Sequence, residues 1–314
     1  MSGPVEVVDV ERSDQGQAVR LADAPVVTES RLAQVGSLQV RRALPTLGRR
    51  AVGPWCFADH FGPAEVNEHP RPDIGPHPHM GLQTVTWLLD GELMHRDSLG
   101  SEQAIRPGQL NLMTAGLGVA HAEEGVTGYR GPIHGIQLWV AQPSATRDAP
   151  PAFEHHAELP KVEFSGGVGT VLVGEVAGAS SPARRDTEHV GLDLNLHPGD
   201  TSIPLDRSYE YAVVVTIGTV TIPGQTVGPG HLVYLGSGRD QLDLHIDDAG
   251  RALLLGGVPC AEPLLMWWNF VARTRDEVEV AYEDWASDSG RFGMVDSSLP
   301  RIETTRPVWR PPTR

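Results

Sequence analysis

The 314-residue chain has only two cysteines, Cys56 and Cys260, and they lie far apart in the sequence. It has no Cys-x-x-Cys pair and no disulfide framework, which is typical of a protein from a reducing compartment. Residues 1–17 carry acidic side chains and lack the basic region and apolar run of a signal peptide. No apolar stretch approaches the length of about 18 residues that a transmembrane helix needs. We therefore expect a cytoplasmic protein that is not bound to a membrane.

Positive charge is also scarce, because 25 lysines and arginines stand against 40 acidic residues and the net charge is −15. Such a chain is repelled by phosphate backbones, which argues against direct binding to nucleic acid. The short basic clusters Arg41-Arg42 and Arg49-Arg50 are interpreted as solvated charges on loops or strand edges. We expect a monomer, and its acidic charge fits a protein partner better than nucleic acid.

Turn-forming residues, by contrast, are abundant: the 35 glycines and 26 prolines make up almost a fifth of the chain, against an average of about 12%. Long helical periodicity is nearly absent, so the composition predicts an all-β protein with short strands. Residues 38–41, 84–89 and 133–140 have the β-branched, aromatic or alternating pattern of strands. The pair Asp90-Gly91 predicts a tight hairpin turn after the second of these runs.

The strand-like runs fall into two halves of similar length, which suggests an internal duplication. We predict a flexible N-terminal arm over 1–25, a first β domain over 26–142 and a second over 164–295. The proline-rich segment 143–163 is interpreted as a linker, and its His155-His156 pair as solvated. An extended tail is expected over 296–314.

One short helix is predicted over 274–287, near the end of the second domain. Thr274 and Glu277 have the spacing of a capping box at a helix N-terminus. Four residues then follow at helical spacing and form one apolar stripe that should pack against a sheet: Val278, Ala281, Tyr282 and Trp285.

Two pairs of side chains indicate a metal site in the first domain. His77 and His79 are two residues apart, and so are His121 and Glu123. Because side chains alternate faces along a β-strand, each pair points to one face. If the two strands are neighbours, three imidazoles and one carboxylate converge. Pro78 cannot donate a backbone hydrogen bond, which places its strand at an edge or at a bulge.

This ligand set suits one divalent transition metal, and Fe(II), Mn(II), Ni(II), Cu(II) and Zn(II) all remain open. Four protein ligands on an octahedral ion leave two open positions, whereas a structural zinc site is closed and tetrahedral. The other histidines of the first domain are interpreted as supporting or structural: His60, His69, His95 and His134. The second half has four histidines but no such pair, so we expect no metal there: His189, His197, His231 and His245.

Several longer motifs resemble those of the pirin family, within the bicupin superfamily. The resemblance extends over residues 30–295, and the stretches that carry it are Phe57-Ala58-Asp59-His60-Phe61-Gly62-Pro63, Pro76-His77-Pro78-His79-Met80-Gly81, His95-Arg96-Asp97-Ser98-Leu99-Gly100, Met113-Thr114-Ala115-Gly116-Leu117-Gly118, His121-Ala122-Glu123 and Trp267-Trp268-Asn269-Phe270-Val271-Ala272. It implies two antiparallel β-barrel (jelly-roll) cupin domains. The N-terminal one would hold a metal, most often iron, through His77, His79, His121 and Glu123.

The chain departs from the family pattern at two positions. Met80 stands where the family usually has arginine, and Gln83 stands where it often has glutamate. Neither change removes a ligand, but both are expected to change the charge near the pocket.

The resemblance implies a metal-dependent dioxygenase of the quercetin 2,3-dioxygenase type, which cleaves a flavonol ring with O2. Glu123 is then the candidate base for the flavonol 3-hydroxyl proton. Candidate apolar walls of the substrate pocket are Phe57, Leu82, Met113 and Trp139. The alternative is a non-enzymatic, redox-sensing regulatory protein that binds a protein partner through its metal-bearing domain. An oxygen-independent isomerase or hydrolase is a third possibility.

Overall fold

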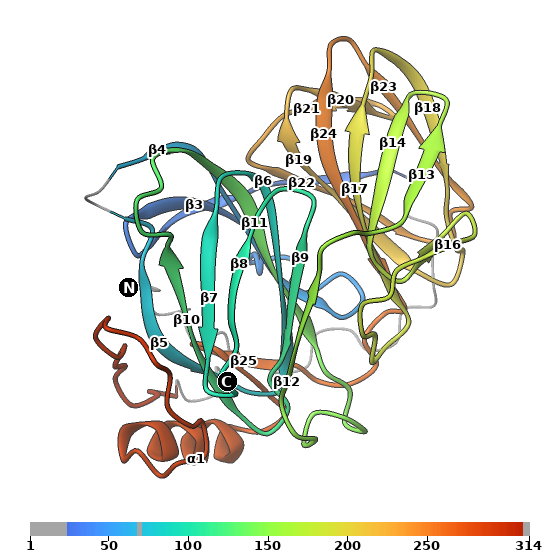
Figure 1. Cartoon of the computed structure of the whole chain (residues 1–314). Coiled ribbons are helices and arrows are strands. Elements are labelled where there is room, and N and C mark those ends of the chain that lie inside the picture. Colours follow the sequence, from blue (N-terminus) through green and yellow to red (C-terminus); the bar gives the residue numbers. More distant parts are fainter. Residues whose placement is uncertain (1–23, 68–70, 310–314) are drawn as a thin grey trace.

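The computed structural model describes residues 24–67 and 71–309. Almost all of the arm predicted over 1–25, together with His69 and the last five residues of the predicted tail, lies outside these residues. The described chain folds into two β domains with one short helix, as Figure 1 shows. This confirms the predicted all-β architecture. Among these residues, no helix is long and apolar enough to cross a membrane.

The N-terminal domain consists of two sheets. Its seven-stranded sheet has the order β12 (Ala152–His156), β9 (Leu110–Thr114), β6 (Leu82–Asp90), β11 (Gly131–Ala141), β4 (Trp55–Val66), β3 (Leu38–Leu44) and β2 (Arg31–Val35). Its four-stranded sheet has the order β5 (Ile74–His79), β10 (Val119–Gly125), β7 (Leu93–Asp97) and β8 (Glu102–Ile105).

The C-terminal domain repeats this arrangement of one seven-stranded and one four-stranded sheet. The larger sheet has the order β1 (Val26–Glu29), β22 (His231–Ser237), β19 (Glu210–Ile217), β24 (Gly250–Gly257), β17 (His189–Leu196), β14 (Gly167–Val173) and β13 (Lys161–Phe164). The smaller has the order β18 (Gly199–Pro204), β23 (Gln241–Ile246), β20 (Val220–Ile222) and β21 (Gln225–Val227). A separate hairpin joins β15 (Glu175–Val176) to β16 (Ala179–Ser180). The repeated plan agrees with the predicted duplication, although the sheets do not close into barrels.

The first described strand does not belong to the domain in which the sequence placed it. β1 pairs antiparallel with β22 of the C-terminal domain, with Val26 opposite Tyr234 and Glu29 opposite His231. The prediction of a domain over 26–142 therefore needs correction at its start. The pairing joins residues about two hundred positions apart, and the local pattern of a short strand carries no signal of its partner.

The predicted linker over 143–163 also needs correction, because it contains two strands. β12 extends the N-terminal sheet by pairing with β9, and β13 extends the C-terminal sheet by pairing with β14. The His155-His156 pair lies in β12, where His155 Nδ1 is 2.7 Å from the Asn111 side chain. Within the predicted linker, the stretch between β12 and β13 is the part that crosses between the domains. The prolines of this segment favoured the prediction of a linker, so the two short strands were not predicted.

The two larger sheets pack against each other through a buried apolar layer that contains residues of both domains. Trp55, one of two tryptophans in this layer, is fully buried. Its indole Nε1 donates to the carbonyl oxygens of Val190 and Gly256, both 3.1 Å away in the C-terminal domain. Its ring also meets the edge of His189 at a centroid distance of 5.2 Å. These contacts fix the orientation of the second domain against the first.

The end of the chain returns to the N-terminal domain. A hairpin of β25 (Leu265–Trp267) and β26 (Phe270–Ala272) leads into α1 (Arg275–Ala286), which lies at the foot of the N-terminal domain in Figure 1. Thr274 is the N-cap and accepts from the Glu277 backbone N–H at 3.3 Å, as the predicted helix requires. The rest of the predicted stripe packs as expected: Val278, Ala281 and Trp285 are buried and Tyr282 is partly buried.

The described part of the tail has no regular secondary structure and runs beside β5. The Ile302 backbone N–H donates to the Pro76 carbonyl oxygen at 2.8 Å. The Ile302 carbonyl in turn accepts from the Trp285 indole at 2.9 Å. Both ends of the chain therefore support the domain opposite to their own position in the sequence.

Candidate metal centre

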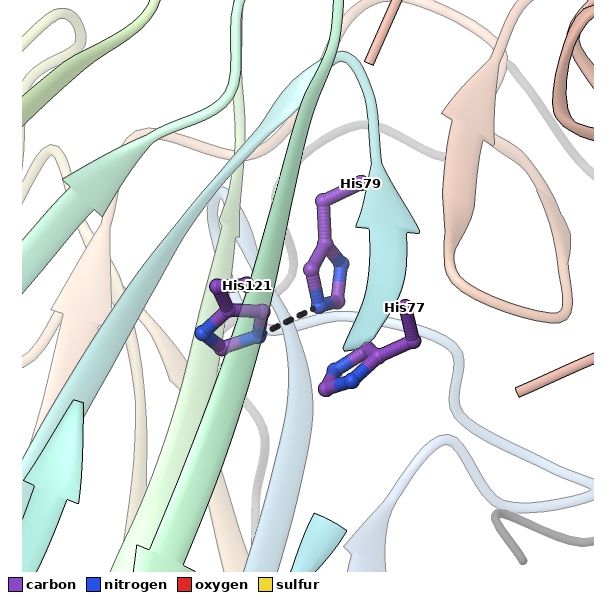
Figure 2. A group of neighbouring side chains, drawn as sticks. All are labelled: His77, His79 and His121. Atoms are coloured by element: carbon purple, nitrogen blue, oxygen red, sulfur yellow. Dashed lines mark hydrogen bonds between the residues drawn. The ribbon is translucent and has the colours of Figure 1, made fainter. Parts of the chain in front are cut away.

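Two neighbouring strands of the four-stranded sheet bring the three predicted histidines together. β5 is the edge strand of this sheet, as Pro78 predicts, and it pairs antiparallel with β10. His77 lies directly opposite His121 in this register. Figure 2 shows the imidazoles of His77 and His79 extending from β5 toward that of His121 on β10. All three are buried, and their ligand nitrogens lie within 4.8 Å of one another.

The backbone fixes which nitrogen of His77 and His79 can bind a metal. His77 Nδ1 is 2.9 Å from the Gly75 carbonyl oxygen, and His79 Nδ1 is 3.2 Å from the Asn269 carbonyl oxygen. A carbonyl oxygen only accepts hydrogen bonds, so each Nδ1 carries the proton and donates it. In the neutral rings the Nε2 atoms are left with free lone pairs, which is the form that ligates a metal.

A chain of three side chains orients the third ligand. His121 Nδ1 is 3.3 Å from His95 Nδ1, and His95 Nε2 is 3.0 Å from the Asp97 carboxylate. Burial raises the pKa of Asp97, but hydrogen bonds from His95 and Ser101 outweigh it and lower the pKa below its ordinary value. When the rings are neutral and Asp97 accepts from His95 Nε2–H, His95 Nδ1 accepts from His121 Nδ1–H. His121 therefore also presents a free Nε2.

These proton positions explain why the donor set fits a cation. His79 Nε2 and His121 Nε2 are only 3.1 Å apart, yet neither carries a proton in the arrangement above. Two facing lone pairs repel each other unless a cation lies beside both. Protonation is disfavoured, because burial lowers the pKa of His77 to about 4 and those of His79 and His121 well below their ordinary values. A transition metal satisfies all three nitrogens at once.

Glu123, the fourth predicted ligand, lies in the wall of the same cavity but outside the three-histidine cluster. The pairing of β10 with β5 shifts register between His121 and Glu123. The extra residue lies in β5, because β10 pairs with β7 without a shift and places Glu123 opposite His95. Glu123 therefore keeps the alternation of β10 and lines the same cavity as His121. Burial raises the pKa of Glu123 to about 7. A hydrogen bond with Thr86 lowers this pKa, but its effect is smaller than that of burial.

The histidines open into a cavity with mostly apolar walls, which we call the metal-site cavity. Besides His77, His79, His121 and Glu123, it is lined by Val35, Leu38, Val40, Arg42, Phe57, Asp59, Phe61, Pro72, Ile74, Leu93, Gln137, Trp139, Trp268 and Asn269. Phe57 and Trp139, two of the four predicted wall residues, stack with their ring centroids 4.0 Å apart. The other two, Leu82 and Met113, are buried in the cluster behind these rings and are not among the lining residues.

Arg42 corrects the interpretation of its basic cluster as solvated charge, because only 3% of it is exposed. Its Nε and Nη2 donate to the two carboxylate oxygens of Asp59 at 2.8 and 2.6 Å. The guanidinium carbon lies 4.7 Å from the Phe57 ring centroid. A bidentate partner and an aromatic face can hold a buried arginine in place. The alternation of Leu38, Val40 and Arg42 along one strand was a signal for this placement.

The two departures from the pirin pattern lie outside the metal-site cavity. Met80 is buried against the C-terminal hairpin, and Arg291 Nη2 is 3.3 Å from its sulfur. Gln83 is buried in the seven-stranded sheet and donates to Thr114 at 3.0 Å. The expected change of charge near the pocket therefore does not extend to the described lining residues.

The histidines of the second half do not gather into a site. His189 is fully buried beside Trp55, and His245 is exposed beside Asp200. His231 Nδ1 is 3.1 Å from the Gly228 carbonyl oxygen. In the described part of the chain, the only group of three or more potential ligands within 4.8 Å is His77, His79 and His121.

Sequence reasoning missed the contribution of the C-terminal hairpin to this site. Trp268 and Asn269 line the metal-site cavity, and the carbonyl of Asn269 orients His79 from 190 residues further along the chain. No periodicity or spacing near His79 could indicate so distant a partner.

Comparison with known proteins assigns both domains. Residues 37–140 match the family Pirin, and residues 191–293 match the Pirin C-terminal cupin domain. A Pseudomonas aeruginosa protein named "Putative quercetin 2,3-dioxygenase" is 43% identical over 90% of each chain. A crystal structure of quercetin 2,3-dioxygenase from Acinetobacter baumannii has a TM-score of 0.88 and 41% identity, and the alignment covers 92% of this chain and 97% of that one.

A more distant structure shares the fold alone. It is that of the bacterial pirin YhhW from Escherichia coli in complex with nickel(II), with a TM-score of 0.61 and 15% identity, covering 76% of this chain and all of that one.

Proposed function

The chain belongs to the pirin family, and on that premise we propose that it is a metal-dependent dioxygenase of the quercetin 2,3-dioxygenase type, which cleaves the ring of a flavonol with O2. The observation that carries this proposal is the convergence of three buried histidines beside a cavity with aromatic walls. The relatives named for this activity support it.

His77, His79 and His121 would hold one divalent metal, for which we propose Fe(II). The mixed nitrogen and oxygen donors of the site also suit nickel, copper, manganese and zinc. When bound, the metal lowers the pKa of a hydroxyl that coordinates it and supplies the redox chemistry for dioxygen.

The side chains of the metal-site cavity would bind and orient the substrate. Phe57 and Trp139 offer flat aromatic surfaces against which a flavonol ring can stack. The carboxylate of Glu123 faces the same space and would take the proton of the flavonol 3-hydroxyl. The apolar lining excludes water from the reacting ring.

The size of the cavity limits how a flavonol can enter. The centres of water molecules can occupy about 80 Å³ of it. We expect a three-ring flavonol to displace side chains at the mouth as it binds. Single-ring phenols should enter with less rearrangement.

The test is turnover of quercetin by protein loaded separately with iron, nickel, copper or manganese, with and without oxygen. We expect the flavonol absorbance to disappear only with both oxygen and metal. A matched sample of the His121→Ala variant controls for reaction at loosely bound metal. If no metal supports oxygen-dependent loss, the dioxygenase proposal is wrong.

In that case the redox-sensing alternative, in which a protein partner binds the metal-bearing domain, becomes the better hypothesis. The net charge of −15 favours a protein partner over nucleic acid. Its test compares recovery of partners by the ferrous and ferric protein.

A further inference from the structure

The side chain of Asn269 is unusual among the polar groups of the metal-site cavity. Only 3% of the residue is exposed, and its Nδ2 is buried without a hydrogen-bond partner. Buried amides are nearly always paired, because an unpaired donor loses its water without replacement. Asn269 also lines the cavity. A purely structural role leaves this unpaired amide unexplained.

The backbone around Asn269 is held in an unfavourable conformation. Asn269 and Trp268 form the two-residue loop between β25 and β26. Trp268 has φ of +52°, in the left-handed region that bulky residues rarely occupy. Packing maintains it, because the Trp268 ring lies 5.6 Å from that of Phe270 and 6.5 Å from that of Trp285. Strain that packing sustains in this way is concentrated at functional sites.

The same loop ties Asn269 to the metal centre. Its carbonyl oxygen accepts from His79 Nδ1 at 3.2 Å, so the residue is separated from the metal position by one imidazole ring. Because Asn269 also lines the metal-site cavity, a substrate that approaches the metal through one oxygen atom would bring a neighbouring substituent toward this side chain. An amide offers both a donor and an acceptor, and its two ends are interchangeable by rotation.

We propose that the Asn269 carboxamide hydrogen-bonds the oxygen substituent next to the one that approaches the metal. The site would then select aromatic compounds with two neighbouring oxygen functions, such as catechols and 3-hydroxyflavones, over those with one. The inference rests on the proposed function, because it assumes a phenolic ligand in the metal-site cavity. It assigns a specificity-determining role to a residue from the far end of the chain.

The experiment measures ligand binding without turnover. Wild type and Asn269→Leu, equally loaded with metal and kept free of oxygen, are titrated with quercetin, 4-nitrocatechol and 4-nitrophenol, and binding is followed by absorbance. We expect the variant to bind the first two about threefold to tenfold more weakly, as for a lost hydrogen bond. Binding of 4-nitrophenol, which lacks the neighbouring oxygen, should change less than about twofold, because it makes no such bond.

Thermal unfolding of the metal-free proteins gives a second readout. Leucine is nearly isosteric with asparagine and removes the unpaired donor, so Asn269→Leu should raise Tm. Gln83→Met is the matched control. Gln83 is also buried with an unpartnered oxygen, Oε1, but it lies outside the metal-site cavity, so its replacement should leave all three affinities unchanged. Asn269→Ala serves if the leucine variant does not fold.

The outcomes separate the two proposals. Weaker binding of 4-nitrocatechol by Asn269→Leu, with no binding of quercetin by wild type, supports this inference and rejects the flavonol substrate. Equal weakening of all three ligands together with a lower Tm means that Asn269 is structural, and the inference fails. It also fails if the variant binds like wild type or if wild type binds no phenol.

Discussion

The two domains share one plan of sheets but fill the space between them differently. In the N-terminal domain, the four-stranded sheet directs His77, His79 and His121 inward, beside a cavity. In the C-terminal domain, the corresponding sheet directs apolar side chains such as Ile203, Leu242 and Leu244 into a closed core. The same arrangement of strands therefore supports either a metal centre or a packed interior, depending on a few alternating positions.

The difference indicates that the two domains have different roles. The C-terminal sheet carries its own histidine, His245, but this side chain points outward and pairs with Asp200 at 2.6 Å. It is about half exposed and has no neighbouring imidazole. The C-terminal domain thus supports the N-terminal domain through Trp55, and its C-terminal hairpin contributes Asn269 to the orientation of His79.

The largest expected effect is the loss of metal from His121→Ala. Removing an ancillary partner of a ligand already weakens metal binding by about 10- to 100-fold, so removing a ligand nitrogen should weaken it by more. We expect the purified variant to lose its metal during dialysis, as measured by elemental analysis. His245→Ala is the matched control and should retain the wild-type content. If His121→Ala stays loaded, or if the control loses metal, the contrast between the domains is wrong.

The next effect tests the scaffold role. Leu254→Ala creates a cavity in the core of the C-terminal domain, where Leu254 is 1% exposed. The expected cost is about 2–5 kcal/mol in the free energy of unfolding, measured with urea on the metal-free protein. Metal bound per folded molecule should not change. A parallel loss of metal affinity would show that the two domains share the site.

The metal centre was predictable because its signal is local. Side chains alternate along every β-strand, so the spacing of His77 and His79 indicated that both face the same side. Pro78 indicated that their strand lies at a sheet edge. The helix was predictable for the same reason. Its N-cap, Thr274, and its apolar stripe all lie within about three helical turns. Glu123 keeps the alternation of its strand and lines the same cavity, but it lies outside the cluster of three histidines, and the period of two alone could not predict that separation.

The parts that were missed are those that depend on distant residues. β1 pairs with β22, and Asn269 supports His79, across about two hundred residues in each case. Arg42 was interpreted as solvated because arginine is usually exposed. Its alternation with Leu38 and Val40 indicated an inward position, but not its partner Asp59 on the next strand. Composition and periodicity carry no information about such pairs.

The smallest expected effect concerns pH and the lone buried histidine between the domains. Burial lowers the pKa of His189 to about 4, with its Nδ1 2.8 Å from the Thr187 carbonyl oxygen. In the unfolded chain this pKa is about 6.5. The stability that neutral His189 provides is therefore complete above pH 6.5 and is lost as the pH falls toward 4. By linkage the loss at pH 5 is about 2 kcal/mol.

The measurement compares urea unfolding of wild type and His189→Gln between pH 7.5 and 5. The variant should lose about 2 kcal/mol less over this interval. Other buried histidines contribute equally to both proteins, so the difference isolates His189. Identical pH profiles would show that His189 does not respond to protonation in this way.

Asn269 lies 190 residues after His79 in the sequence, so His79 is synthesised well before the residue that orients it. A ribosome that has released the whole N-terminal domain has not yet produced the residue that fixes the His79 tautomer. The nascent domain would carry all three imidazoles, but only His77 and His121 would have the partners that orient their rings. The three-histidine site is completed only when nearly the whole chain has emerged, so a prematurely terminated product lacks the contact that orients His79.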